Sequence, residues 1–335
     1  MSKIDFVVMW VDGNDPEWQK EKQKFSVDDN ADGSIYRYRD FGLLKYWFRG
    51  VEKFAPWVNN VYFVTWGHVP EWLDLNNPKL KVVKHSDFIP EEYLPTFSAN
   101  AIENNLHRID GLSEQFVLLN DDFYLIDSVK GTDFFKNGKP MDTVALNVQC
   151  PQRSLVSRFF GINNTAIIND HFNFERSIKE NFWKWYSLKN GKNVLRSIVL
   201  KGCPRFPGFW QHHLASSFCK STFEEVWEKE YEILHQTSSH KFRESTDVNQ
   251  WLFKDWQIAS GNFEVRNVKF GEAFYIDRDG ITNIKNRIIN YITHQKGKMI
   301  AINDGEMSDL EFNLLVEDLE KSFNEILPTK SHFEK

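Results

Sequence analysis

Two acidic sequences stand directly after apolar, strand-forming stretches, where they could hold a metal ion and a phosphorylated ligand. Asp12 and Asp15 follow the first apolar run of the chain, and Asp121 with Asp122 follow the apolar run 116–119. Open α/β sheets bind ligands at the carboxyl ends of their strands. A few carboxylates suffice there for Mg²⁺ or Mn²⁺, because substrate phosphates complete the coordination. Solvated turns are the alternative for either sequence alone, but two of them at equivalent strand ends favour a site.

A further polar group precedes the second acidic sequence. Residues 98–109 have helical periodicity, and one face of that helix would carry Asn100, Glu103, Asn104 and His107. Glu103 with His107 could perform acid–base chemistry or bind a sugar, and a solvated helix face is an equal alternative. Arg39, at the start of an earlier predicted helix, could clamp a phosphate. For Arg39 alone, however, an ordinary surface charge is the favoured interpretation.

The second half of the chain supplies a histidine pair and an arginine. His212 and His213 precede a helical segment, and Arg243 lies in the polar stretch 241–247. Histidine is the usual general base near neutral pH, and arginine stabilises the charge of a phosphoryl transition state. Zinc binding by these histidines with Cys203 is disfavoured, because no second cysteine stands at ligand spacing. The sequence also lacks a Gly-rich phosphate loop and the zinc-protease and serine-hydrolase motifs.

Alternating strand and helix patterns in the first 150 residues predict an α/β sheet that would position these groups. The predicted strands are 4–11, 61–65, 80–83, 116–119 and 143–148, and the predicted helices are 40–54 and 98–109. From about residue 174 the pattern is helical, at 175–188, 221–234, 247–259 and 308–327. Two of these helices begin with capping-box signatures, Ser221 with Glu224 and Ser308 with Glu311. We therefore predict an α/β core in 1–150 with a mainly helical part, 151–335, packed against it in one unit over 1–335.

Composition limits the class of protein. Of 335 residues, 15% are aromatic, which excludes disorder, and no apolar run approaches the length of a membrane-spanning helix. The net charge of −6 disfavours nucleic acid as a partner, since phosphate binding requires a basic face. Three separated cysteines and the lack of an export signal favour a cytoplasmic protein. The isoleucine-rich segment 281–298 allows a peripheral contact with the inner face of the membrane, although a helix packed in the core is the favoured interpretation.

Four ordered blocks of this sequence resemble the Stealth family of sugar-phosphate transferases. The first block is IDFVVMWVDGNDP at 4–16, and the second consists of two long stretches at 37–73 and 94–125. The third is HHLASSFCKSTFEEVWEKE at 212–230, and the fourth is KFRESTDVNQWL at 241–252. The ending at 327–334 is similar to that of the bacterial members. The resemblance covers nearly the whole chain and implies a nucleotide-sugar-binding α/β core.

The same resemblance implies a reaction. A hexose-1-phosphate, usually of an N-acetylhexosamine, would pass from a UDP-sugar donor to a hydroxyl of a growing oligo- or polysaccharide, and UMP would be released. The product would belong to a capsule or exopolysaccharide, and the acceptor would be free or lipid-linked. Trp66 stands where many members have asparagine, which leaves the donor preference open.

Site roles follow from the resemblance, block by block. His213 would be the catalytic base, with His212 as the alternative, because the distance of His213 from Arg243 along the chain fits the family spacing better. Arg243 would bind the transferred phosphate, and Glu103 with Asp122 would serve the phosphate and the acceptor.

The remaining roles concern the donor and the metal. Asp121 and Asp122 would hold Mg²⁺ or Mn²⁺. The turn from Asp12 to Asp15 would hold the nucleotide, with Arg39 nearby. Aromatic side chains flanking these places could stack on uracil or sugar rings, namely Trp10, Trp66, Phe123 and Trp210.

Two rival functions remain open from the sequence. A metal-dependent glycosyltransferase would also use paired aspartates at a strand end, but it would transfer the sugar and release UDP. A non-catalytic carbohydrate-binding module would use the aromatic side chains alone.

Overall fold

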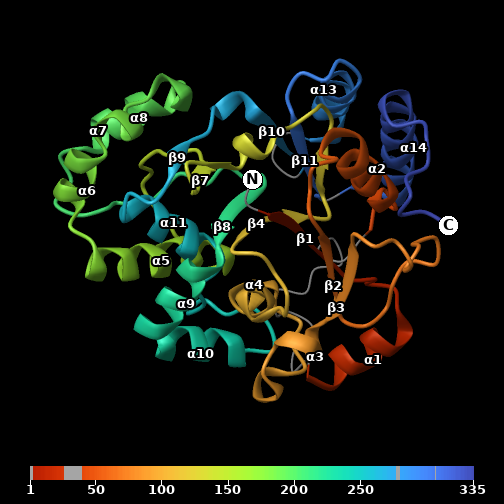
Figure 1. The fold of residues 1–335 in the computed structure, drawn as a ribbon, viewed down its shortest axis with the longest axis horizontal. Helices are drawn as coiled ribbons and strands as arrows, with labels where there is room; N and C mark the ends of the chain where they lie inside the picture. The colour runs from red at the N-terminus through yellow and green to blue at the C-terminus, as the bar shows by residue number, and fades with distance from the viewer. Residues whose placement is uncertain (1–2, 26–39, 277–279, 306) are drawn as a thin grey trace.

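A five-stranded sheet forms the centre of the fold in the computed structural model, which describes residues 3–25, 40–276, 280–305 and 307–335 (Figure 1). Its strand order is β3-β2-β1-β4-β8, formed by Leu80–Lys84, Val61–Thr65, Ile4–Trp10, Gln115–Asn120 and Ser216–Cys219. Strands β1 to β4 run parallel, and β8 pairs antiparallel with β4. Four of the five predicted strands are therefore confirmed, and the carboxyl ends of β1, β2 and β4 meet at one edge of the sheet.

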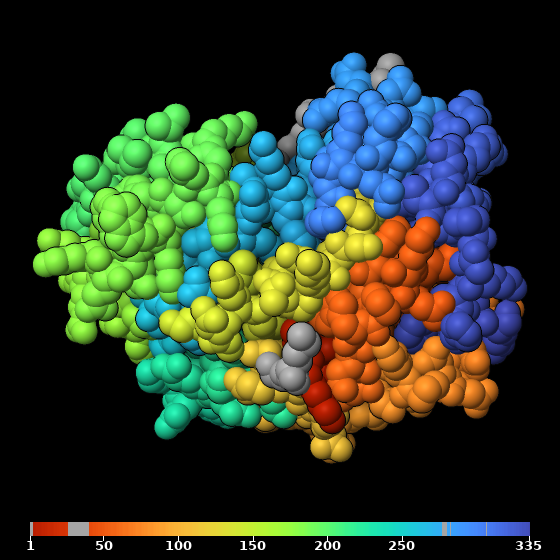
Figure 2. Space-filling view, turned by 45° about the horizontal axis from the view of Figure 1, so that its top comes forward, coloured from red at the N-terminus to blue at the C-terminus, as the bar shows by residue number. Residues whose placement is uncertain are grey.

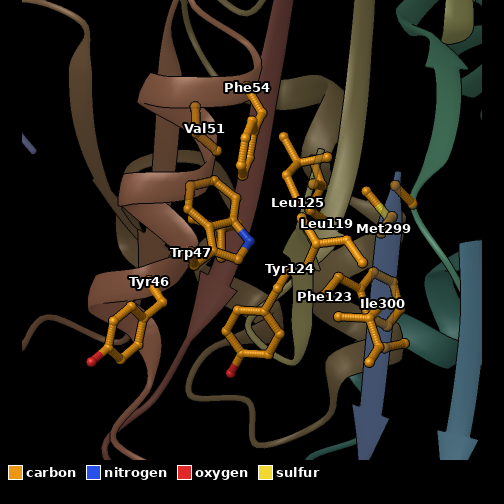
Figure 3. Close-up of a cluster of buried hydrophobic side chains, with 14 of the residues drawn as sticks. Tyr46, Trp47, Val51, Phe54, Leu119, Phe123, Tyr124, Leu125, Met299 and Ile300 are labelled. Carbon is orange, nitrogen blue, oxygen red and sulfur yellow. The ribbon is translucent and has the colours of Figure 1, made fainter. Parts of the chain in front are cut away.

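Strand β1 is apolar except for Asp5, because both faces of the sheet are covered. Phe6 and Val8 belong to one buried cluster, whereas Val7 between them belongs to the other. Helix α2 (Leu44–Phe54) covers the first face, where its aromatic and aliphatic side chains point toward the strand β5 (Phe123–Leu125) (Figure 3). Gly50 permits this close packing, since a Cβ atom there would lie 2.8 Å from the carbonyl oxygen of Leu125.

A second sheet extends the first cluster. It has the order β10-β11-β5, with β10 at Gly271–Tyr275 and β11 at Met299–Asn303. Helices α13 (Ile281–Thr293) and α14 (Asp309–Ile326) pack beside it and beside α2 (Figure 1). Ile284, Ile288 and Ile292 of α13 are fully buried, so the interpretation of this segment as a core-packing helix is confirmed.

The predicted strand at 143–148 is wrong. The third sheet instead contains β6 (Phe135–Lys136), β7 (Lys139–Asp142) and β9 (Glu264–Val265), and residues 143–148 form only an isolated bridge from Leu146 to Phe209. Side chains replace the missing strand partners. The amide of Val144 donates to Asn190 Oδ1 at 3.3 Å, and the amide of Leu146 donates to Ser197 Oγ at 3.1 Å. An apolar run can therefore be buried without joining a sheet when polar side chains satisfy its amides.

The second half is mainly helical, as predicted, but its helices are shorter than the patterns suggest. They are α5 (Ser157–His171), α6 (Phe174–Glu180), α7 (Phe182–Trp185), α8 (Asn193–Leu200), α9 (Lys220–Lys229), α10 (Tyr231–Ser239) and α11 (Trp251–Ala259). The predicted helices at 175–188 and 221–234 break at Asn181 and Glu230, the residues at which α6 and α9 end. Their side chains lie mostly in the second buried cluster, on the other face of the central sheet.

Of the two predicted capping boxes, one is present in the structure and the other is not. Ser308 and Glu311 form the predicted capping box of α14. Ser221 does not cap α9, because its hydroxyl and amide bond the carboxylate of Glu114 instead. The first half also contains α1 (Pro16–Phe25) and α3 (His85–Phe88). Helix α4 (Ala99–Asn104) is shorter than predicted and is followed by a 3₁₀ turn at Leu106–Arg108. None of the helices in the described ranges is both long and apolar enough to cross a bilayer.

Candidate active site

One histidine joins the turns that follow β1 and β2. The Asp12 amide donates to His68 Nε2 at 2.8 Å, and His68 Nδ1 lies 3.3 Å from Asp15 Oδ2. Asp15 Oδ1 also accepts the amides of Glu17 and Trp18 at the start of α1, at 2.8 and 2.9 Å. These amides, that of Trp18 foremost, hold the pKa of Asp15 below its ordinary value against the opposing effect of its burial. Asp15 is therefore a helix-capping residue that fixes this turn.

Three carboxyl groups gather at the neighbouring strand end. Asp121 and Asp122 follow β4, and Asp40 precedes α2, where it accepts a hydrogen bond from Trp10 Nε1 at 3.2 Å. Burial, and next the charge of Asp40, raise the pKa of Asp121 to about 7. Burial and the charge of Asp121 raise the pKa of Asp122 well above its ordinary value. The predicted phosphate-binding Arg39 lies outside the described residues.

These carboxylates fit a cation that a ligand helps to coordinate. A carboxyl group whose pKa is raised by a neighbouring carboxylate would be stabilised in its ionised form by a bound cation. Among the described residues, no three His, Cys, Asp or Glu side chains form a complete metal site. Mg²⁺ commonly binds through one or two carboxylates plus substrate phosphates, so Asp121 and Asp122 suit that incomplete type of site. Asp40 was missed by the sequence prediction, although its place at the start of the predicted helix 40–54 could have indicated it.

Glu103 is buried beside the loop that carries Arg243. Its Oε1 accepts a hydrogen bond from Gln250 Nε2 at 3.3 Å. Burial raises the pKa of Glu103 to about 7, and the nearby Arg243 charge partly opposes that rise. The charge of Arg243 thus acts on a carboxyl group that lies 140 positions earlier along the chain.

Fixed contacts hold the Arg243 loop. The carboxylate of Asp247 is fully buried and accepts from Asn100 Nδ2 at 2.9 Å and from the Glu244 amide at 3.0 Å, and it pairs with His240 Nδ1 at 2.7 Å. On the other side of Arg243, the ring of Phe242 stacks on Phe97, with ring centres 5.4 Å apart. This loop is therefore fastened to the first half of the chain.

The predicted pairing of Glu103 with His107 is not observed. Helix α4 ends at Asn104, which moves His107 away from the face that Glu103 occupies. His107 is buried against Phe223 and Trp227 at ring-centre distances of 5.8 and 5.9 Å. Burial lowers the pKa of His107 to about 3, so it is a neutral core residue at physiological pH.

His213 lies between the two groups described above. Three aromatic rings surround its imidazole: Phe123, Tyr275 and Trp251, at ring-centre distances of 5.1, 6.0 and 6.2 Å. Phe123 directly follows Asp122, and Trp251 directly follows Gln250, the partner of Glu103. His213 therefore stands next to residues adjoining both the acidic strand end and the Glu103 site.

His212 has different surroundings. It stacks on Trp210 at 5.0 Å. Burial, then the charges of Arg266 and Lys254, lower the pKa of His212 to about 3. The two adjacent histidines are thus distinct: His212 belongs to a buried cationic environment, whereas His213 belongs to the aromatic enclosure at the strand ends.

A buried polar network, which the sequence did not reveal, supports this histidine segment. Gln211 Nε2 donates to both carboxyl oxygens of Asp255, at 2.9 and 3.0 Å, and Lys254 Nζ donates to Gln211 Oε1 at 2.8 Å. Lys254 Nζ also lies 3.5 Å from Asp142 Oδ1, and Arg266 lies 3.6 Å from the same oxygen. Burial raises the pKa of Asp255 to about 7. In the sequence, the only sign of this network is the pair Lys254 and Asp255 within an otherwise apolar helical pattern.

Fold and relatives together define the class of this chain as an α/β transferase. It is 44% identical to the capsular polysaccharide phosphotransferase WcwK of Streptococcus pneumoniae, over 100% of this chain and 99% of that protein. It is also 44% identical to the receptor polysaccharide phosphotransferase WefC of Streptococcus oralis, over the whole of both chains. The exopolysaccharide phosphotransferase cps2G of Lactiplantibacillus plantarum is 38% identical, over 99% of this chain and 96% of that one.

Two conserved regions identify the family. Residues 2–26 match Stealth protein CR1, conserved region 1, and residues 37–142 match Stealth protein CR2, conserved region 2. The chain belongs to the Stealth protein family. Among solved structures, the galactosyltransferase LgtC aligns over 98% of both chains with a TM-score of 0.44 and 8% identity.

Proposed function

We propose that this chain transfers a hexose-1-phosphate, that of an N-acetylhexosamine in particular, from a UDP-sugar to a hydroxyl of a growing polysaccharide. UMP is the second product, and the polysaccharide belongs to a capsule or exopolysaccharide. The full-length similarity to named polysaccharide phosphotransferases carries this proposal. The grouping of acidic strand ends, His213 and the Glu103–Arg243 pair supports it, because phosphoryl transfer requires positioned charges and a base.

The acceptor hydroxyl attacks the β-phosphorus, and the bond from that phosphorus to the oxygen bridging the two phosphates breaks. His213 takes the hydroxyl proton through an imidazole nitrogen as the new phosphodiester forms. Arg243 binds the transferred phosphate and offsets the charge that spreads over its oxygens. Glu103, with a pKa of about 7, holds the acceptor through a hydrogen bond, and its partner Gln250 keeps the carboxyl oriented.

The donor lies along the carboxyl ends of β1 and β4. The turn from Asp12 to Asp15, fixed by His68, holds the nucleotide. Asp121 and Asp122 would hold Mg²⁺ or Mn²⁺, and that cation supplies positive charge against the diphosphate. The aromatic rings around His213 exclude water from the place where the hydroxyl loses its proton.

We further propose that residues 1–335 act as one catalytic unit. Strand β8 from the second half completes the sheet of the first half, and β5 from the first half completes the sheet of the second. The unit would work in the cytoplasm on an oligo- or polysaccharide acceptor that is free or linked to lipid.

Incubation with a panel of UDP-sugars, a polysaccharide acceptor and Mg²⁺, followed by chromatography of the released nucleotide, tests this function. UMP together with a phosphodiester in the product supports it. UDP as the only nucleotide released would instead establish a glycosyltransferase. A binding module would release neither nucleotide, and it would retain its function in polysaccharide assembly after Glu103→Gln with Arg243→Ala.

A further inference from the structure

The lobe formed by α6, α7 and α8 lies at the edge of the molecule opposite α14 (Figures 1 and 2), and it carries several exposed apolar side chains. Leu188 is 92% exposed, Trp183 is 85% exposed and Val199 is 80% exposed. Phe182, Leu195 and Ile198 are exposed beside them in the sequence. We name these six residues the α7–α8 patch. Large apolar side chains rarely gather on a surface without a partner.

Helix α8 is inverted relative to an ordinary amphipathic helix. Asn193 and Ser197 face inward and are buried, whereas Leu195 and Val199 face solvent. The inward hydroxyl of Ser197 accepts the Leu146 amide at 3.1 Å. Because Ser197 on the polar face satisfies a buried backbone amide, that face of α8 must point inward, and the apolar face is therefore exposed to solvent.

The lobe is anchored firmly enough to present this face. Trp185, two residues after the exposed Trp183, is fully buried, and its ring centre lies 6.2 Å from those of Phe206 and Phe209. Lys184 Nζ donates to the carbonyl oxygen of Phe263 at 2.6 Å. The exposure of Trp183 is therefore not a result of a loose helix.

The segment that carries the patch is basic, although Glu180 precedes it and Glu264 lies 3.5 Å from Lys184. Residues 181–205 contain six basic residues and no acidic residue, in a chain whose net charge is −6. The basic residues are Lys184, Lys189, Lys192, Arg196, Lys201 and Arg205. Lys192, Lys201 and Arg205 are exposed among the apolar side chains. Protruding Trp and Leu with surrounding Lys and Arg is the composition that inserts into the headgroup region of an anionic bilayer.

We propose that the α7–α8 patch docks this protein on an anionic lipid bilayer. Trp183, Leu188 and Val199 enter the headgroup boundary, and the basic residues contact the acidic headgroups. This surface is distinct from the 281–298 segment, of which Ile284, Ile288 and Ile292 are buried in the cluster that includes α14 and the second sheet. The inference does not depend on the reaction proposed above.

Flotation of the full-length chain with lipid vesicles tests the proposal. We expect binding to vesicles of phosphatidylglycerol mixed with phosphatidylcholine and not to phosphatidylcholine alone. Combined Trp183→Ser, Leu188→Ser and Val199→Ser should reduce the partition coefficient at least about tenfold, because apolar insertion is lost. Combined Lys192→Glu and Lys201→Glu should reduce it by about tenfold, and salt should weaken the binding of the unaltered chain.

A matched control removes exposed apolar side chains elsewhere. Leu310 and Leu314 of α14 are 70% and 48% exposed, so Leu310→Ser with Leu314→Ser should leave vesicle binding unchanged. Melting temperatures will show that each variant folds, and all of them should release UMP from a soluble donor at the original rate. Absence of binding to anionic vesicles, or equal binding by the patch variants, would overturn the proposal. So would a dimer in solution that the patch variants convert to monomer, since the patch would then be a self-interface.

Discussion

The imidazole of His213 lies edge-on to the phenyl ring of Phe123, with the ring centres 5.1 Å apart. Phe123 begins β5 immediately after Asp122, so this contact joins the histidine segment of the second half to the acidic strand end of the first. Tyr275 and Trp251 complete the enclosure from β10 and α11. Three elements far apart in the sequence therefore define the surroundings of one imidazole.

This enclosure makes His213→Ala the most direct test of the proposed base. Turnover should fall by about two orders of magnitude or more, because proton removal by a positioned base contributes that much. Donor binding, measured by calorimetry with the UDP-sugar, should remain, since the residues that would hold the nucleotide are on other elements.

Two further variants are needed to interpret the turnover of His213→Ala. His332→Ala serves as the control, because this side chain is 92% exposed and pairs only with Glu52 in the described part of the chain. His212→Ala should reduce turnover less than His213→Ala. The reverse order would transfer the role of base to His212, and near-original turnover in both would remove both from the mechanism.

The acidic strand end should respond to divalent cations even without substrate turnover. Mg²⁺ should raise the melting temperature, because it offsets repulsion between the adjoining carboxyl groups of Asp121 and Asp122. Ligand excess of about 100-fold over Kd corresponds to about 2.7 kcal/mol, a shift of several degrees for a chain of this size. Asp122→Asn should abolish most of the shift, and Asp170→Asn, at an exposed position on α5, should not. An equal shift in all three proteins would place the cation elsewhere.

Much of the fold could be predicted because its pattern is local. The strands that carry Phe6, Phe63 and Leu118 are mostly apolar, since both sheet faces are covered. The capping box at Ser308 was equally local. The site is different, because its supports are long-range: Gln211 and Asp255 are 44 residues apart, and Asp12 and His68 are 56 apart. No spacing rule in the sequence connects such pairs.

The difference between local sequence patterns and long-range contacts also explains the two wrong predictions. The run at 143–148 has the composition of a strand, but distant side chains of Asn190 and Ser197 satisfy its amides. His107 has the spacing of a partner for Glu103, but the helix ends between them, at Asn104. Where tertiary contacts decide, the local pattern alone gives the wrong partner.

Glu103 should make the stability of the protein depend on pH in a predictable direction. Its pKa rises from 4.5 to about 7 on folding, so the folded chain binds the proton more tightly than the unfolded chain. The contribution of Glu103 to the free energy of unfolding is therefore most favourable below about pH 4.5. It falls as the pH rises from about 4.5 to about 7 and stays constant at higher pH. Glu103→Gln should remove this loss and stabilise the protein by about 1–3 kcal/mol at pH 8, while abolishing transferase activity.

Glu311 offers a control of opposite sign. Hydrogen bonds from Ser308 hold the pKa of Glu311 below its ordinary value, so its contribution is present at neutral pH and is lost on acidification. Glu311→Gln should therefore lower the melting temperature at pH 8, where Glu103→Gln raises it. Urea unfolding at pH 5 and pH 8 will measure both; a Glu103→Gln protein that is less stable than the original at pH 8 would contradict the burial of an ionised carboxylate.

The network behind the histidine segment should contribute more to stability than any surface ion pair. Lys254 is 1% exposed, and its ammonium lies 2.8 Å from Gln211 Oε1 and 3.5 Å from Asp142 Oδ1. Lys254→Met keeps most of the side-chain volume but leaves Asp142 without one of its two cationic neighbours, so the cost should be about 3 kcal/mol. Lys321→Ala provides the comparison, because its 70% exposed side chain lies 3.6 Å from Asp318 and should contribute less than about 1 kcal/mol. Urea unfolding at pH 7 measures both losses, and equal small losses would show that Asp142 is adequately neutralised by Arg266 alone.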